Sequence, residues 1–155
     1  MSTTPRQIAL PFAARSRPYR AVLIELSWTA GILQITRDSV LEWVDCGYLR
    51  NVWNLAAPKA RSRELRFDSG EVYRIQAGIT PSGESMDKVI ERVIGHPEEP
   101  TLHSETVAGI LCTTRTMVHW WLNTNELVGP DQVNHRQMIS RASFAEFLRK
   151  RWVTP

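Results

Sequence analysis

Two threonine–arginine pairs carry the side chains of this chain that are best suited to bind an anion. Thr36 and Arg37 form the first pair, and Thr114 and Arg115 form the second, 78 positions later. A guanidinium group donates two parallel hydrogen bonds, a geometry that matches a phosphate or the O6 and N7 atoms of guanine. Arg37 and Arg115 are therefore candidates for contact with nucleic acid, through a base edge or through a phosphate alone.

Both pairs lie in a segment that the chain contains twice. Residues 30–49 read AGILQITRDSVLEWVDCGYL and residues 108–127 read AGILCTTRTMVHWWLNTNEL, with nine of twenty aligned positions identical. Unrelated segments of ordinary composition would share about one position in twenty. Since two copies are too few for a solenoid, the repeat predicts two small tandem domains.

Each copy predicts two short helices joined by a tight turn. The hydroxyl group of Thr36 is expected to cap a helix over Arg37–Cys46, and that of Thr114 to cap one over Arg115–Asn123. Apolar residues in both helices recur at spacings of three and four, which directs one face to the core. Two short helices with this connection are typical of a helix-turn-helix.

A hairpin and a final helix are expected after each second helix. The returning strands of the two hairpins are predicted at Arg63–Phe67 and Arg136–Ile139. The final helices are predicted to start at Asp68 or Ser69 and at Ser140, because these side chains favour helix N-termini. A hairpin in this position is a wing.

One further helix is expected between the copies. The stretch SGESMDKVIERVIG predicts a helix capped near Ser85 and ended by Gly95. Its apolar residues are Met86, Val89, Ile90, Val93 and Ile94. Two roles remain open for this stripe: packing the two domains together, or forming a homo-oligomer through the helix at 84–94.

The two copies resemble the excisionase and MerR-type winged helix-turn-helix family. Its pattern is VA-x-LLGVS-x-x-TV-x-x-W-x-x-x-G-x-L, a basic hairpin, and an end like RI-x-x-x-D-x-x-x-FL. The second copy follows this pattern over about 101–152 and the first over about 24–75. The chain departs from it at Cys112, which replaces a turn glycine, and at Asn125, which corresponds to Gly47 of the first copy.

The resemblance implies a mainly α (α+β) fold with two tandem winged helix-turn-helix domains, each with a small β-hairpin wing, joined by a connecting helix. The expected divisions are a basic N-terminal arm at 1–21, a first domain at 22–80, a connecting helix and linker at 81–100, and a second domain at 101–155.

The resemblance also implies sequence-specific binding of double-stranded DNA at a bipartite site. Such a protein is a small transcription regulator or excisionase-like architectural factor of a bacterium, phage or mobile element, located in the cytoplasm. The second helix of each unit would enter the major groove, with the wings and the arm on phosphates. The expected DNA-contacting residues are Thr36, Arg37, Asp38, Leu41, Lys59, Arg61, Arg63, Arg66, Thr114, Arg115, Thr116, His119, His135 and Arg136, with Arg15, Arg17 and Arg20 in the arm.

Charge alone leaves a rival interpretation open. Residues 1–21 hold four arginines and no acidic residue, which suits a polyanion. Asp38 and Glu42, however, are expected on the exposed face of the first copy's second helix, where carboxylates would meet phosphates. The alternative is a non-catalytic interaction adaptor or assembly factor, in which one or both winged helices no longer bind DNA.

No catalytic, metal or cofactor site is expected. Four histidines and two cysteines show no metal-ligand spacing, and the chain has no phosphate-binding glycine loop. No apolar run is long enough to span a membrane, and no small-molecule ligand is implied. Cys46 and Cys112 are expected to be free buried thiols, and Trp43 and Trp121, at equivalent positions, to be buried in the cores.

Overall fold

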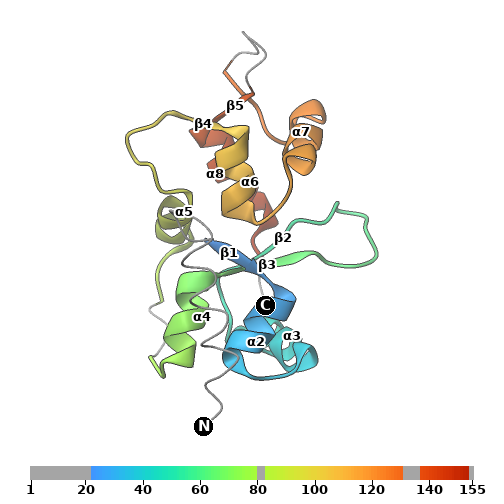
Figure 1. The fold of residues 1–155 in the computed structure, drawn as a ribbon, viewed down its shortest axis with the longest axis vertical. Helices are drawn as coiled ribbons and strands as arrows, with labels where there is room; N and C mark the ends of the chain where they lie inside the picture. Colours follow the sequence, from blue (N-terminus) through green and yellow to red (C-terminus); the bar gives the residue numbers. More distant parts are fainter. Residues whose placement is uncertain (1–21, 80–82, 131–136, 154–155) are drawn as a thin grey trace.

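The computed structural model describes residues 22–79, 83–130 and 137–153, and over them the fold is mixed α/β (Figure 1). The elements are β1 (Leu23–Glu25), α2 (Leu26–Leu33), α3 (Arg37–Asp45), β2 (Val52–Asn54), β3 (Leu65–Asp68), α4 (Ser69–Gln76), α5 (Met86–Ile94), β4 (Thr101–His103), α6 (Ser104–Leu111), α7 (Arg115–Asn123), β5 (Met138–Ser140) and α8 (Arg141–Arg151). We call β1 to α4 the first unit and β4 to α8 the second unit. No helix within the described residues is long and apolar enough to cross a bilayer.

The duplication in the sequence is also present in the backbone. Helices α2 and α6, and α3 and α7, begin and end at positions 78 residues apart. The residue after the first helix is left-handed in both units, with φ 58° at Gln34 and 54° at Cys112. Gly47 and Asn125 also share a positive φ, of 83° and 62°. Asparagine tolerates this conformation, which explains why it can replace the glycine.

Threonine side chains start the second helix of each unit, as the sequence predicts. Thr36 Oγ1 accepts a hydrogen bond from Ser39 N at 3.0 Å, and Thr114 Oγ1 accepts one from Met117 N at 3.2 Å. The predicted range of α7 is confirmed, while α3 ends one residue early because Cys46 serves as its C-cap.

Small antiparallel sheets complete both units. In the first unit the strand order is β1-β3-β2, with Ile24 and Val52 both opposite Phe67. In the second unit β5 pairs with β4, which precedes the helices. The returning strands were predicted to begin at Arg63 and Arg136, but β3 begins two residues later than predicted, and residues 131–136 lie outside the described residues. The described residues between α7 and β5 form no strand, so the hairpin predicted for the second unit stays a prediction.

The connecting helix packs its apolar face against both units and exposes its polar face. Ser85 caps α5 and Gly95 ends it, as predicted. Four residues of the apolar stripe, Val89, Ile90, Val93 and Ile94, are buried in a cluster that also holds Trp53 of the first unit and Phe144 of the second, while Met86 is exposed. The chain itself thus covers most of the face through which a homo-oligomer was expected, and the homo-oligomer stays a prediction. The predicted packing role of the stripe is confirmed.

The chain after α8 returns to the first unit. Trp152 forms an antiparallel bridge with Trp53, and Val153 N donates a hydrogen bond to Val52 O at 2.8 Å. The two indole rings meet edge to face with centroids 5.1 Å apart. The cluster around α5 therefore takes in residues of both units, while the first unit also has a second cluster of its own around Val40 and Phe67. One backbone connection outside the linker joins the units.

Three expectations about buried side chains need correction. Trp121 is buried, whereas Trp43 at the equivalent position is only partly buried. Cys46 is exposed and Cys112 is half-buried, so the predicted burial of both thiols is wrong. The turns that carry these cysteines lie near the surface, where α3 ends and where α6 gives way to α7.

Replacing Ile90 by alanine tests whether α5 holds the two units together. Ile90 is 1% exposed, so Ile90→Ala is expected to lower the free energy of unfolding by about 2–5 kcal/mol in a single urea transition. Met86→Ala, on the same helix but 36% exposed, should cost about 0.5 kcal/mol or less. Equal losses in the two variants would show that the stripe is not part of the core.

Candidate functional site

The second helices of both units lie toward the same side of the molecule. Figure 1 shows α3 and α7 along one side, with the loop between β2 and β3 projecting from that side between them. Helices α4 and α5 lie on the other side of the view. The elements that carry the described residues for which DNA contact is expected therefore lie toward one side of this view.

The N-terminal turn of α3 is open to solvent. Thr36, Arg37 and Asp38 are exposed, and Leu41 is half-buried one turn later. Beside this turn is a depression of about 370 Å³ between α3 and the strand that returns from the loop. Its walls are formed by Glu25, Leu26, Ser27, Arg37, Leu41, Arg63, Glu64, Leu65 and Arg66. The structure thus brings four of the expected residues to one place, together with two carboxylates that sequence reasoning did not single out.

The N-terminal turn of α7 is exposed in the same way. Arg115 and Thr116 face solvent, and His119 is half-buried. Arg115 Nη1 lies 3.1 Å from Glu105 Oε1, but both side chains are more than half exposed, so this ion pair is weak and easily exchanged. Trp120 adds an apolar group to the surface, since it is 58% exposed.

The loop between β2 and β3 carries the cations predicted for the first wing. Lys59, Arg61 and Arg63 are exposed, and Arg63 Nη1 is 3.7 Å from Asp45 Oδ1 at the end of α3. That contact links the loop to α3. Exposed cations of this kind bind phosphates with strong salt dependence.

Arg66 has a different role from the one the sequence predicts. It is 5% exposed, and its Nε donates to Leu111 O at 2.9 Å while Nη2 donates to Cys112 O and Glu64 Oε2, both at 3.0 Å. The last carbonyl groups of a helix lack hydrogen-bond partners within the helix. A cation beside them also interacts favourably with the negative end of the helix dipole. Arg66 is thus fully engaged in binding the first unit to the end of α6, and the prediction of a DNA contact is wrong.

Several expected contacts lie outside the described residues. These are Arg15, Arg17 and Arg20 of the expected N-terminal arm, with His135 and Arg136 of the hairpin expected in the second unit. Within the described residues, no three histidine, cysteine or acidic side chains are grouped to hold a metal ion.

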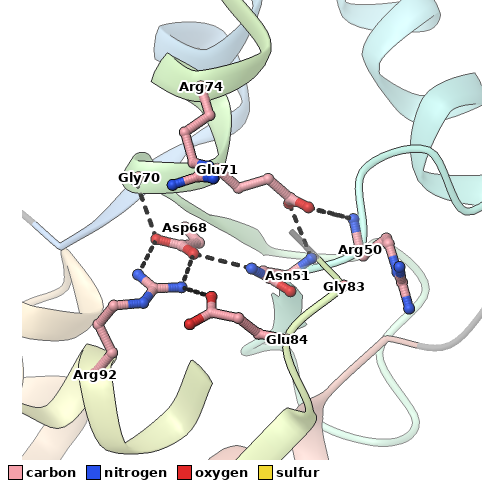
Figure 2. A pocket seen from close by; sticks show the side chains of 9 residues that line it. All are labelled: Arg50, Asn51, Asp68, Gly70, Glu71, Arg74, Gly83, Glu84 and Arg92. Atoms are coloured by element: carbon pink, nitrogen blue, oxygen red, sulfur yellow. Dashed lines mark hydrogen bonds and ion pairs between the residues drawn. The ribbon is translucent and has the colours of Figure 1, made fainter. Parts of the chain in front are cut away.

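A second polar cluster joins α4, α5 and the start of β2, and sequence reasoning did not find it (Figure 2). Asp68, which caps α4, accepts hydrogen bonds from Gly70 N, from Asn51 Nδ2 and from Arg92 Nη2, the last at 2.9 Å. Arg92 also contacts Glu84 at 2.9 Å, and the bond to Asp68 raises its pKa.

The Glu71 side chain in this cluster binds other partners than its spacing from Asp68 predicts. The stretch Asp68 to Glu71 has the spacing of a capping box, in which the glutamate would bond back to the N–H of the capping residue. Instead, Glu71 Oε1 accepts from Asn51 N at 2.9 Å and from Arg50 N at 3.2 Å, which ties α4 to the turn that follows α3. Burial raises the pKa of the Glu71 carboxyl, and these two hydrogen bonds oppose the rise.

Comparison with known proteins gives no relative for this arrangement. No family model, no curated protein and no solved structure matches the chain.

Replacing Arg66 by methionine, which keeps most of the volume but removes the donors, tests its structural role. Arg66→Met leaves the carbonyl groups of Leu111 and Cys112 without their donor, so we expect a loss of about 1–3 kcal/mol in the free energy of unfolding, measured in urea. Arg63→Met, whose side chain is 40% exposed, is the matched control and should change stability by about 0.5 kcal/mol or less. A neutral Arg66→Met would contradict the role given to this side chain.

Proposed function

We propose that the chain binds double-stranded DNA sequence-specifically through two winged helix-turn-helix units and has no catalytic activity. The observation that carries this proposal is the repeated, solvent-exposed threonine–arginine start of α3 and α7, located on the side of the molecule that also carries the cationic loop. In biological terms it would be a small transcription regulator or an excisionase-like architectural factor.

The proposed DNA contacts fall into two groups, base contacts from the helices α3 and α7 and phosphate contacts from the loop between β2 and β3. The first turn of a recognition helix lies nearest the base edges of the major groove, which gives Arg37 and Arg115 the role of reading guanine. Arg37 is exposed beside a depression, and Arg115 needs to leave only a weak ion pair. Lys59 and Arg61 would contact phosphates, since they are exposed and lie on the projecting loop.

The packing between the units adds a constraint on the DNA site. Arg66, the shared core around α5 and the Trp53–Trp152 bridge join the units outside the linker. If α3 and α7 both bind DNA, the distance between their half-sites is then set by the protein rather than by a flexible tether. The proposed target is a bipartite site of fixed spacing.

One set of observations favours the rival function of an interaction adaptor. Asp38 and Glu42 are exposed on α3, as expected, and they would repel phosphates. Trp120 and Tyr48 are exposed at 58% and 46%, which suits a protein surface. On this alternative one or both units bind a protein partner instead of DNA.

Selection from a random pool of double-stranded DNA separates the two functions. The complete chain should enrich a motif with two half-sites, and Arg37→Ala and Arg115→Ala should each weaken one half-site by about 1–3 kcal/mol. Lys88→Ala, which removes an exposed charge from α5, is the matched control and should enrich the parent motif.

The outcomes are distinct. A single half-site, lost only in Arg115→Ala, would make the first unit structural. No enrichment at low salt would reject DNA binding and favour the adaptor. Reversing the charges of Lys59, Arg61 and Arg63 should abolish DNA affinity, whereas binding to a protein partner should persist.

Changing the distance between the two half-sites tests the fixed spacing. Inserting about five base pairs moves one half-site to the opposite side of the duplex, so we expect the affinity to fall to that of a single half-site. An insertion of equal length outside the motif is the control and should have no effect. Equal affinity at every spacing, measured by fluorescence anisotropy, would show that the units bind independently.

A further inference from the structure

A cavity of about 400 Å³ lies between α4, α5 and the start of β2, on the side of the molecule away from the cationic loop (Figures 1 and 2). Three arginines and three carboxylates contribute to its walls. The formal charges of the walls therefore cancel, and the sign of a ligand has to be argued from which of these groups already have partners.

The acceptors in the walls are occupied. Asp68 is buried and accepts from Arg92, from Asn51 Nδ2 and from Gly70 N. Glu71 accepts from two backbone N–H groups, and Glu84 is paired with Arg92 at 2.9 Å. A ligand that offered hydrogen-bond donors would have to displace these bonds.

The donors in the walls are not all occupied. Arg92 is held by Asp68 and Glu84, but the guanidinium groups of Arg50 and Arg74 have no hydrogen-bond or ion-pair partner among the described residues. Both side chains are exposed, so they can move toward a ligand. Gly83, with φ 70°, adds no side chain beside Arg50, and a Cβ there would be 3.9 Å from Arg50 Nη1.

We propose that this cavity binds a small organic phosphate whose oxygen atoms accept hydrogen bonds from Arg50 and Arg74. A guanidinium fork matches the oxygen atoms of a phosphate group, and Arg50 and Arg74 line the cavity from different segments, so a ligand with several oxygen atoms could contact both. The cavity also exceeds what an inorganic ion would fill and falls in the volume range of small-molecule sites, about 300–1,000 Å³. A phosphate of the DNA backbone is a poor candidate, because α4 and α5 lie away from the side that carries α3, α7 and the loop.

Binding here would act on the contact between the units. Arg50 and Arg74 belong to the first unit, while Gly83, Glu84 and Arg92 form another wall. Arg92 lies on α5, whose apolar face is in the cluster that holds the buried residues of the second unit. A ligand held by the first unit against α5 stabilises this contact, because it binds only when both walls are in place. The site does not depend on DNA binding and can be tested without it.

Calorimetric titration of the complete chain with glycerol 3-phosphate, ribose 5-phosphate and adenosine monophosphate tests the proposal. At least one of the three should bind, and the Arg50→Gln/Arg74→Gln double variant should weaken that binding by about tenfold or more. The same ligand should raise the melting temperature of the parent protein but not of the double variant. The control is Lys88→Gln/Lys150→Gln, which removes two exposed charges outside both the cavity and the loop and should leave binding unchanged.

Three results would overturn the proposal. The first is no binding of any of the three phosphates to the folded parent protein. The second is an equal loss in the control, which would mean general attraction of anions to surface cations. The third is equal binding of succinate with the same dependence on Arg50 and Arg74, which would assign the site to carboxylates. Circular dichroism of each variant confirms that a loss of binding is not a loss of folding.

Discussion

The way the two units pack together depends on one buried guanidinium group, that of Arg66. Arg66 extends from the central strand of the first unit to the carbonyl groups at the end of α6, where backbone acceptors have no partner within the helix. Moving an arginine out of water costs free energy unless its donors are satisfied, and here they are bound to carbonyl oxygens and to Glu64. Separation of the units would leave the Arg66 guanidinium and the carbonyl groups of Leu111 and Cys112 without these hydrogen bonds. The contact therefore fixes the two units to one another at the turn that precedes α7.

The repeat has become asymmetric around this contact. Both units keep the same two helices and the same turn, but the residue two positions before the cap of the last helix is Arg66 in the first unit and Met138 in the second. The first unit supplies the donor and the second supplies the acceptors. Position 66 is buried, whereas position 138 is only half-buried, so the two equivalent positions differ in burial as well as in residue type.

Local signals in the sequence predicted the local structure well. Thr36 and Thr114 marked where α3 and α7 begin, and Ser85 and Gly95 marked both ends of α5, because caps act within one turn. Local errors were confined to element ends and to the burial of Trp43, Cys46 and Cys112, and the roles that sequence reasoning missed depend on contacts at long range. Arg66 follows Arg61 and Arg63 in a basic run and could not be told from a surface cation, since its acceptors lie about 45 residues away. Glu71 likewise had the spacing of a local cap but bonded to Arg50 and Asn51, and the cavity beside it had no signal in the sequence.

The bond from Val153 to Val52 has a consequence for the order in which the protein is made. Strand β2 is an edge strand, and its carbonyl group at Val52 is covered by a residue that leaves the ribosome only after the whole second unit. Until then the edge is open to pairing with other chains, and the surface of Trp53 that Trp152 covers is bare. A nascent first unit therefore exposes an unpaired strand edge and an aromatic surface that the finished protein covers.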